Sequence, residues 1–399
     1  MTSPQRWAES YPWLGTDPVP TEPCTSPEVY AREVERVFRR VWLCMGRAEE
    51  IAEVGSYKLK RLDFASTDVL LIRGKDHEIR AFHNTCSHRG NNVVTPEGSW
   101  DQWGRKKVFT CRFHAWSYDT EGRLAGVQDE KRFPPCFQKE QNGLTEIHCD
   151  SWQGFVFVNL AEKPAQPLDE FLGAMGEHFA GYPYHELSHN FTYHTVLNCN
   201  WKIGVDAFSE AYHVNTIHAG SFPGTFSTGL QMVKLYGDHR TTAVCFNPPK
   251  EGPPVASLAQ QKARGSLVDN VAATMLPPTI NDEKRNDFSF ELSVFFPNWL
   301  LHVAEGIWFT HQFWPIGHDR CLWEGKYYVR PPRTNSERWA LEHAIVLQRN
   351  AWLEDTATME GTFFSLRSGA KKHMQLQDEE ILVRHGYHVL EQYLSGERP

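Results

Sequence analysis

The sequence predicts an α+β protein, in which a small antiparallel β domain is followed by a larger mixed domain. From residue 55 to about 160, short alternating apolar runs are separated by turn signals such as Gly74-Lys75-Asp76, a texture typical of antiparallel strands. Residues 161–167, AEKPAQP, then form a polar, proline-bearing connection. Beyond it helical and strand-like patterns mix, and 399 residues leave room for two domains of roughly 100–200 residues each.

The composition is that of a globular protein and narrows the possible partners. Hydrophobic residues make up 41 % and aromatic residues 13 %, which excludes a disordered chain. A net charge of −8 without a basic stripe gives no reason to expect a nucleic-acid partner. Because the first residues lack an apolar leader and no stretch reaches the roughly 18–20 apolar residues that span a bilayer, we expect a cytoplasmic protein without a membrane segment. Nine cysteines, an odd number, favour reduced or metal-bound thiols over a disulfide framework.

Local patterns predict the individual elements. A cap signal at Ser26-Pro27 and apolar residues at helical spacing predict an amphipathic helix within 26–50. Strands of the β domain are expected at 57–62, 69–73, 79–82, 108–110 and 155–160. In the larger domain we expect helices at 168–179, around 201–218 and at 341–361, and strands at 191–197, 242–246 and 288–296. Residues 248–281, rich in Pro, Gly, Ser and Ala, predict a long surface loop or lid.

Two short loops of the β domain each carry one cysteine and one histidine. Residues 86–90 read CSHRG and residues 111–118 read CRFHAWSY, with 22 residues between the two pairs. Two Cys and two His can hold one zinc ion, or a diiron cluster in which two His replace two Cys on one iron. Zinc fingers pair like ligands, whereas here each loop supplies one thiolate and one imidazole and so can reach both metals of a cluster. The pattern therefore favours a cluster held by Cys86, His88, Cys111 and His114, with zinc as the alternative.

Together with Trp116, Tyr118, Gly122 and Leu124, these loops resemble the Rieske domain of ring-hydroxylating oxygenases. The resemblance implies a [2Fe–2S] cluster with Cys86 and Cys111 on one iron and His88 and His114 on the other. It also implies electron delivery from NAD(P)H through a ferredoxin, a flavin reductase or both. The 22-residue gap is longer than usual for the family and implies a larger loop around 92–107.

The resemblance extends to the domain organisation. It implies an N-terminal antiparallel β Rieske domain and a C-terminal catalytic domain with a helix-grip (START/Bet v 1-like) fold. The expected parts are an N-terminal helical segment packing on the catalytic domain at 1–50, the Rieske domain at 51–160 and the catalytic mononuclear iron domain at 168–399.

A second group of metal-binding residue types lies within 200–218, NWKIGVDAFSEAYHVNTIH. Two histidines and one carboxylate with open positions form the facial triad of non-haem Fe(II) oxygenases. His213 and His218 are five residues apart, about 140° off one face of a regular helix, so they converge only if the helix is broken or carries a π-bulge. Judged from the residue types alone, a pair of histidines near a helix end more often has a structural role than a metal-binding one. The family signature, however, is Asp or Glu followed by His and a second His at this spacing, and it favours a ligand pair for a mononuclear Fe(2+).

The third ligand is expected on the helix at 341–361. Asp355 lies on the apolar stripe of Ile345, Trp352, Met359 and Phe363. A carboxylate on a core-facing stripe is costly unless it is paired, protonated or metal-bound. Its neighbour Glu354 is turned about 100° and can reach solvent. Asp355 is therefore the candidate third ligand, with an Arg-paired structural aspartate as the alternative.

Two further acidic residues are candidate catalytic residues. By the resemblance, Glu210 bridges His213 to His114 of a neighbouring subunit and so carries electrons between the two sites; a solvated helical glutamate is the alternative. Asp206, seven residues before His213, stands where many relatives have Asn and is expected near the site. A bridge between subunits implies a head-to-tail homotrimer, with or without a small β subunit.

The expected reaction uses O2 to hydroxylate or dihydroxylate a hydrophobic small molecule that is aromatic, terpenoid or steroid-like. The alternatives are a monooxygenase or demethylase of a quaternary ammonium compound such as a betaine or carnitine, which needs an aromatic cage, and a non-catalytic electron carrier or zinc-stabilised module. About a third of eight aromatic candidates are expected to line the pocket, the rest being ordinary core: Phe208, Phe222, Phe295, Phe296, Trp308, Phe309, Phe313 and Phe363.

Overall fold

The computed structural model describes residues 6–98, 101–248 and 276–398, together with residues 255, 258, 259 and 262. Two compact units are present: Met1–Val37 with Leu172–Pro399, and Phe38–Phe171. Within the described part of the chain, none of the helices combines the length and the apolar character needed to cross a membrane. Most of the expected loop or lid at 248–281 lies outside the described residues.

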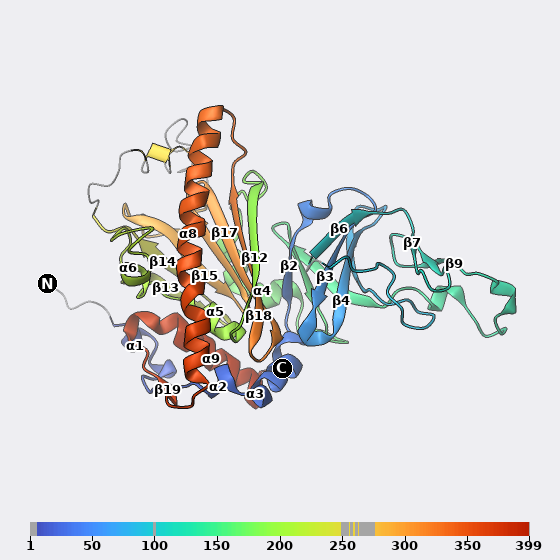
Figure 1. Ribbon diagram of the computed structural model, residues 1–399, viewed down its shortest axis with the longest axis horizontal. Coiled ribbons are helices and arrows are strands. Elements are labelled where there is room, and N and C mark those ends of the chain that lie inside the picture. Colours follow the sequence, from blue (N-terminus) through green and yellow to red (C-terminus); the bar gives the residue numbers. More distant parts are fainter. Residues whose placement is uncertain are drawn as a thin grey trace. The chain divides into compact units, whose positions relative to one another are not determined.

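The unit Phe38–Phe171 is an antiparallel β structure, as expected (Figure 1). Its seven-stranded sheet has the order β2 (Leu43–Arg47), β11 (Phe155–Asn159), β10 (Glu146–Trp152), β5 (Ile79–His83), β4 (Thr67–Arg73), β3 (Ser56–Leu62) and β6 (Asp101–Arg105). A second, three-stranded sheet consists of β7 (Phe109–Thr110), β8 (Ser117–Tyr118) and β9 (Leu124–Gly126). The five strands predicted in this region are all present, whereas β6, β8, β9 and β10 were not predicted.

The helix predicted within 26–50 is correct only in its first part. Ser26 caps α3 (Pro27–Glu33), its hydroxyl accepting a hydrogen bond from the Val29 N–H at 3.1 Å, and a π-helical turn ends at Phe38. The helical prediction is wrong for Leu43–Arg47, which form β2 and pair with β11. Leu43, Cys44 and Met45 are consecutive buried residues. A strand covered on both faces buries such a run, whereas an amphipathic helix would expose part of it.

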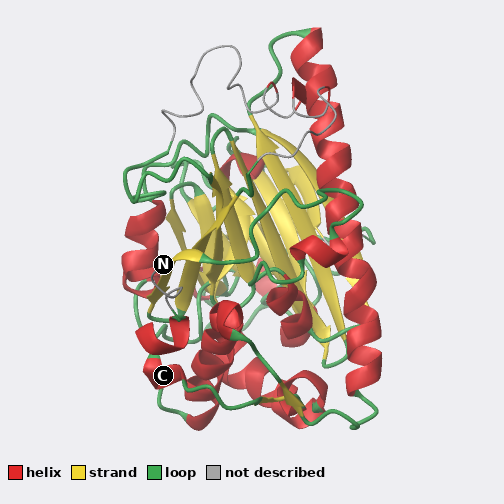
Figure 2. Ribbon diagram, turned by 90° about the vertical axis from the view of Figure 1, so that its left-hand side faces the viewer, coloured by secondary structure: helices red, strands yellow, loops and turns green. Residues whose placement is uncertain are grey.

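The larger unit is built on a second antiparallel sheet of seven strands (Figure 2). Their order is β12 (His189–Leu197), β18 (Arg320–Val329), β17 (Ile307–Gly317), β16 (Trp299–Ala304), β15 (Phe288–Phe295), β14 (His239–Cys245) and β13 (Gln231–Tyr236). The helix α8 (Asn335–Leu366) runs along this sheet in both views (Figures 1 and 2). A curled antiparallel sheet with a long helix against it is the helix-grip arrangement, so the predicted α+β class is confirmed.

The remaining helices of this unit include α5 (Trp201–Ala207), α6 (Val214–Ile217), α9 (Ile381–Ser395) and the part of α4 (Leu168–Phe179) from Leu172 onward. The packing of α5 against β17 requires a glycine: a Cβ added at Gly204 would lie 2.2 Å from the Phe313 ring. This close approach holds the end of α5 against the sheet, and the chain then passes directly into residues 208–218.

A buried ion pair ties α3 to α5. Glu33 is fully buried, and its carboxylate accepts hydrogen bonds from the Lys202 ammonium at 2.6 Å and from the Trp201 indole at 2.9 Å. Removing one partner of a buried pair leaves an uncompensated charge. We therefore expect Glu33→Ala to lower the free energy of unfolding of this unit by about 3 kcal/mol or more, measured by urea denaturation.

Glu33→Met combined with Lys202→Met serves as the control, because an apolar pair leaves no charge unpaired and should recover most of the lost stability. An unchanged unfolding midpoint for Glu33→Ala would show that the buried pair does not stabilise this unit.

Candidate metal centres

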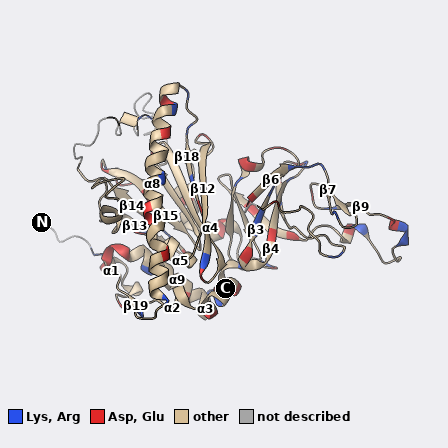
Figure 3. Cartoon of the chain, viewed as in Figure 1, with Lys and Arg blue, Asp and Glu red and all other residues tan. Residues whose placement is uncertain are grey.

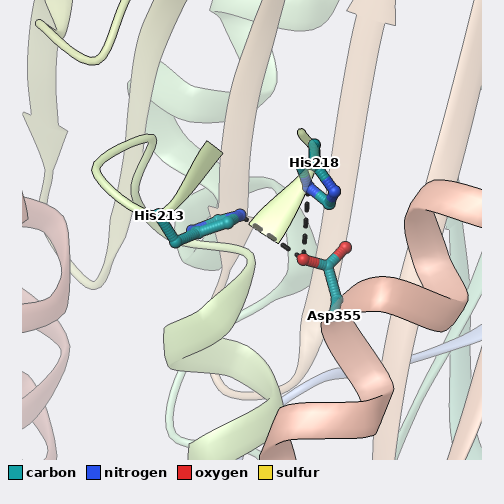
Figure 4. A group of neighbouring side chains, drawn as sticks. All are labelled: His213, His218 and Asp355. Carbon is teal, nitrogen blue, oxygen red and sulfur yellow. Dashed lines mark ion pairs between the residues drawn. The ribbon is translucent and has the colours of Figure 1, made fainter. Parts of the chain in front are cut away.

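Three side chains from two distant segments meet in the larger unit (Figure 4). The Nε2 atoms of His213 and His218 lie 3.4 Å and 3.3 Å from Oδ1 of Asp355. One donor atom from each of the three residues lies within 4.8 Å of the others. The structure therefore brings together the three residues that the sequence suggested as mononuclear iron ligands.

The local backbone explains how two histidines five residues apart converge. The regular helix α5 ends at Ala207, and His213 and His218 bracket the single turn α6. Their ring centroids are 5.3 Å apart. The expected irregularity is present, although the helix already breaks before His213.

These residues fit a metal ion. Two donors that each lie about 2.1 Å from one ion stand roughly 3.0–3.4 Å apart for angles of 90–109° at the metal. The Asp355 residue is only 3 % exposed, and its Oδ1 has no hydrogen-bond donor in the described structure. A buried carboxylate oxygen without a donor is costly, and a cation between the three donors removes that cost.

The electrostatics also call for a cation. Burial alone would lower the pKa of His213, but the nearby carboxylates of Asp355 and Glu210 raise it to about 10. The pKa of His218 is likewise raised, because Asp355 and Glu354 outweigh the effect of burial. Two histidines among three carboxylates therefore hold protons tightly, and a divalent ion can replace these protons.

Each histidine is oriented by a second carboxylate. The Nδ1–H of His213 donates to Glu210, which also accepts from the backbone N–H of Tyr212 and His213. The Nδ1–H of His218 donates to Glu354 at 2.9 Å, and Ser221 donates to the same carboxylate oxygen at 2.6 Å. Both Nε2 atoms are thereby left free to bind a metal. The sequence placed Glu354 toward solvent and did not predict its contact with His218. That contact forms because α8 lies beside α6.

A cavity of about 130 Å³ opens beside the triad. Of the eight aromatic candidates, Phe208, Phe222 and Phe309 line it, and the other five are buried in the core. Sequence reasoning missed several further lining residues: Phe226, Phe246, Phe290, His302, His311 and Tyr327. The sequence carried a signal for one of them, since His302 interrupts the otherwise apolar strand β16.

Asp206, which was expected near the site, does not line this cavity. It is two residues before Phe208, about 200° around the helix, so the two side chains leave α5 on opposite sides. Its carboxylate accepts a hydrogen bond from the Tyr387 hydroxyl of α9 at 2.8 Å, in a separate small pocket with Lys202 and Arg240. Burial raises the pKa of Asp206 to about 7. Asp206 therefore belongs to the packing of α5 against α9.

The unit Phe38–Phe171 contains the other four candidate ligands at its loop tips. The His88 and His114 rings are 4.6 Å apart, and the Cys86 and Cys111 thiols also lie close enough to interact. Both thiols are buried, whereas both imidazoles are partly exposed. Thiol is thus paired with thiol and imidazole with imidazole, the pairing that a cluster with one Cys-bound and one His-bound iron requires.

Hydrogen bonds reach both thiols, although burial still raises the pKa of Cys86. Burial would raise the pKa of Cys111, but the Asn91 side chain and the backbone N–H groups of Phe113 and His114 outweigh burial and lower it. The Tyr118 hydroxyl lies 3.1 Å from the Cys86 sulfur, and His88 stacks on Trp116. Donors aimed at sulfur favour the thiolate and tune the potential of a bound cluster.

The expected larger loop around 92–107 contains the additional strand β6. This strand pairs with β3 at the edge of the sheet, where buried Asp101 lies 3.0 Å from Lys58 and 3.1 Å from Lys60. The extra length therefore extends the sheet and leaves the four candidate ligands in place.

Together, the two donor sets define a protein with two separate non-haem iron centres, and comparison with known proteins agrees. Residues 182–396 match the family model for the ring hydroxylating alpha subunit (catalytic domain), and residues 41–140 match the model for the Rieske [2Fe-2S] domain. The chain belongs to the ring-hydroxylating alpha subunit family of Rieske oxygenases. Its cofactors are accordingly a [2Fe–2S] cluster and a mononuclear non-haem iron, as predicted.

Relatives of this chain include both monooxygenase and dioxygenase subunits. The carnitine monooxygenase oxygenase subunit of Acinetobacter pittii (strain PHEA-2) is 30% identical over 215 residues, 53% of this chain and 54% of the relative. The biphenyl 2,3-dioxygenase subunit alpha of Rhodococcus jostii (strain RHA1) is 32% identical over 221 residues, 53% of this chain and 45% of the relative. The chain thus spans about half the length of the curated relatives it matches.

Solved structures share the fold. Naphthalene 1,2-dioxygenase from Rhodococcus sp. bound to indole has a TM-score of 0.80 at 19% identity, with 100% of both chains covered. The quaternary ammonium Rieske monooxygenase CntA in complex with an inhibitor has a TM-score of 0.75 at 20% identity, covering 94% of this chain and 95% of that chain. At these identities the likeness concerns the fold alone.

Proposed function

We propose that this chain is the terminal oxygenase component of a Rieske system, which uses O2 to hydroxylate or dihydroxylate a hydrophobic small molecule. In this proposal His213, His218 and Asp355 hold the mononuclear iron, and Cys86, His88, Cys111 and His114 hold the cluster. The observation that carries it is the convergence of two histidine Nε2 atoms on the unpartnered Asp355 oxygen beside a cavity. When bound, the cluster stores and passes electrons, and the mononuclear iron supplies the centre at which O2 is reduced.

The protein side chains bind and orient the substrate. Aromatic residues make up much of the cavity wall and exclude water from the metal site. A cavity of about 130 Å³ is close to the ~150 Å³ that admits benzene. Within the proposed substrate class, this size favours single-ring compounds over steroids.

A quaternary ammonium substrate is the second candidate, supported by the carnitine monooxygenase relatives. The rings of Phe309, Tyr327 and Trp352 line the cavity with centroids 6.0 to 6.4 Å apart, so they could present their faces to a cation.

The proposed electron path runs between subunits of a head-to-tail homotrimer, with or without a small β subunit, and is fed from NAD(P)H through a reductase or ferredoxin. Glu210 contacts His213 in this chain, and the bridge requires His114 of a neighbouring chain. Exposed aromatic residues flank both ends of this path: Phe113, 56 % exposed, precedes His114, and Tyr212, 59 % exposed, precedes His213. Such rings suit a subunit interface.

The function is tested on the purified protein. We expect iron and acid-labile sulfide in the proportion of one [2Fe–2S] cluster plus one further iron. We also expect substrate-dependent NAD(P)H oxidation, coupled to oxygenated product, in a screen of aromatic, terpenoid, steroid and betaine-like compounds. A colourless protein that holds zinc, the sign of a non-catalytic module, would reject the proposal. If carnitine is the only compound in the screen that yields product, the quaternary ammonium substrate is the correct candidate.

Glu354→Gln tests the orientation of His218. The amide weakens the acceptor for the Nδ1–H of His218 and for Ser221, and loss of such outer partners typically costs about 10- to 100-fold in metal affinity. We expect this loss in Fe(2+) titrations of the iron-depleted mononuclear site, with the visible spectrum of the cluster unchanged. Wild-type iron affinity would show that His218 does not depend on Glu354.

Glu210→Gln tests the proposed bridge. With Fe(2+) supplied in excess so that the mononuclear site is filled, we expect both metal centres to be present and the oxidation of a pre-reduced cluster to slow by at least about tenfold in single-turnover mixing with substrate and O2. The conservative Glu210→Asp variant should recover part of the rate. A normal single-turnover rate in Glu210→Gln would rule out the bridge.

A further inference from the structure

Two buried histidines in the cavity wall have no use in the metal site. His302 of β16 is 2 % exposed, and neither of its ring nitrogens has a hydrogen-bond partner in the described structure. His311 of β17 is fully buried, and its Nε2 also lacks a partner among the described residues. Buried polar atoms are normally paired, so unpaired nitrogens beside a cavity indicate that a ligand completes them.

The two rings lie side by side on the cavity face of the sheet. The strand register places His302 opposite Phe309 and His311 opposite Leu300, so the imidazoles are diagonal neighbours, with centroids 5.4 Å apart. Phe309 stacks on His302 at 4.6 Å and Phe208 stacks on His311 at 3.9 Å. Because a ring covers one face of each imidazole, the nitrogens at the ring edges are the groups available to a ligand.

This part of the wall carries no formal charge. Burial lowers the pKa of His302 to about 3 and that of His311 well below its usual range, so both rings are neutral near pH 7. The strands β16 and β17 contain no Lys, Arg, Asp or Glu. The sheet of the larger unit is drawn mostly in tan, the colour of uncharged residues (Figure 3). Among the described residues that line the cavity, the only such residues are Glu210 and Asp355, both at the metal site. The histidine pair therefore offers no countercharge to a carboxylate, and a quaternary ammonium group, which has no N–H or O–H, cannot pair with its nitrogens.

The hydrogen bond from Trp323 determines which proton His311 offers. The indole N–H of Trp323 donates to Nδ1 of His311 at 3.1 Å. A neutral imidazole that accepts at Nδ1 carries its proton on Nε2, so His311 presents a donor to the ligand. His302 has both nitrogens free and can offer one donor and one acceptor. A hydroxyl group can accept a hydrogen bond from His311 and donate one to His302, and a carbonyl oxygen can accept a hydrogen bond from each ring.

The histidine pair also lies next to the metal site. His311 contacts Trp352 at 4.9 Å between ring centroids, and Trp352 is about one helical turn before Asp355 on α8. The stacking partner of His311, Phe208, is two residues before Glu210. A small ring bound by the histidines would therefore extend toward His213, His218 and Asp355.

We propose that His302 and His311 form a polar subsite that binds an uncharged hydroxyl or carbonyl substituent of a single-ring substrate. This inference rests on the proposed oxygenase function of the cavity and narrows the substrate class to phenols, aryl ketones and their alicyclic counterparts. Bare hydrocarbons, carboxylates and quaternary ammonium compounds should bind less well.

The test is a matched ligand series measured by calorimetry on the metal-loaded protein, without O2 or reductase. The ligands are toluene, 4-methylphenol, 4-methylbenzoate and the trimethylanilinium ion. We expect 4-methylphenol to bind at least about tenfold more tightly than toluene. In the variant His302→Phe/His311→Phe this preference should fall to about twofold or less. Phe246→Leu, in the same cavity, should change both affinities alike and preserve their ratio.

Equal wild-type affinity for toluene and 4-methylphenol would overturn the subsite, and so would tighter binding of the benzoate or of the ammonium ion. If the double variant does not fold, the subsite is tested by the wild-type ligand series together with the single variant His302→Phe. Iron content and the cluster spectrum of the same samples separate this result from the proposed function. If the protein oxygenates substrate but does not prefer 4-methylphenol over toluene, only the subsite is rejected. If it shows a preference that depends on the histidines but does not oxygenate, only the proposed function is rejected.

Discussion

Asp355→Ala is expected to lose the mononuclear iron and all measurable oxygenation while keeping the [2Fe–2S] cluster. The Asp355 carboxylate supplies the one oxygen donor of the candidate triad and faces both histidine Nε2 atoms at 3.3–3.4 Å. Without it, two neutral imidazoles remain, which bind Fe(2+) far more weakly than the full facial triad. The measurements are the iron-to-sulfide ratio, the visible spectrum and product formation.

Glu360→Gln is the matched control, since it removes a carboxylate from the same helix where Glu360 contacts Asn198. We expect this variant to keep its iron and its turnover. Retained oxygenation in Asp355→Ala would reject the ligand assignment.

Cys111→Ala is expected to abolish the cluster and therefore turnover. The Cys111 sulfur is buried beside Cys86, and the hydrogen bonds that lower its pKa keep it ready to bind as a thiolate. One iron of the cluster then has a single protein thiolate, which does not hold it. We expect loss of the visible cluster absorption, with Fe(2+) binding at the mononuclear site retained.

Cys136→Ala provides the comparison, because Cys136 is an exposed free thiol in the same unit. Its spectrum and activity should match the wild type. An unchanged cluster spectrum in Cys111→Ala would show that the sulfur ligands are assigned wrongly.

Burial and helix register at the candidate site were predictable, because they depend on local periodicity. Asp355 on the stripe of Trp352 and Met359 had to be buried once that stripe faced the core, and it is. Likewise, the five-residue step from His213 to His218 does not fit one face of a long regular helix, and the helix is interrupted before His213, leaving a single turn between the two histidines. The segment 43–47 was mispredicted because apolar spacing alone does not distinguish a helix from a doubly buried strand.

The sequence by itself determined the order of the domains, the family and the two candidate donor sets, because residue type and spacing are local properties of the chain. Only the tertiary structure decided which side chains surround those donors. The contact of Glu354 with His218 requires α8 to lie beside α6, and Asp206 is directed away from the cavity by its position around α5. The unpaired nitrogens of His302 and His311 depend on strand pairing and on Trp323. Contacts between residues far apart in sequence follow from the packing of whole elements, which no local pattern specifies.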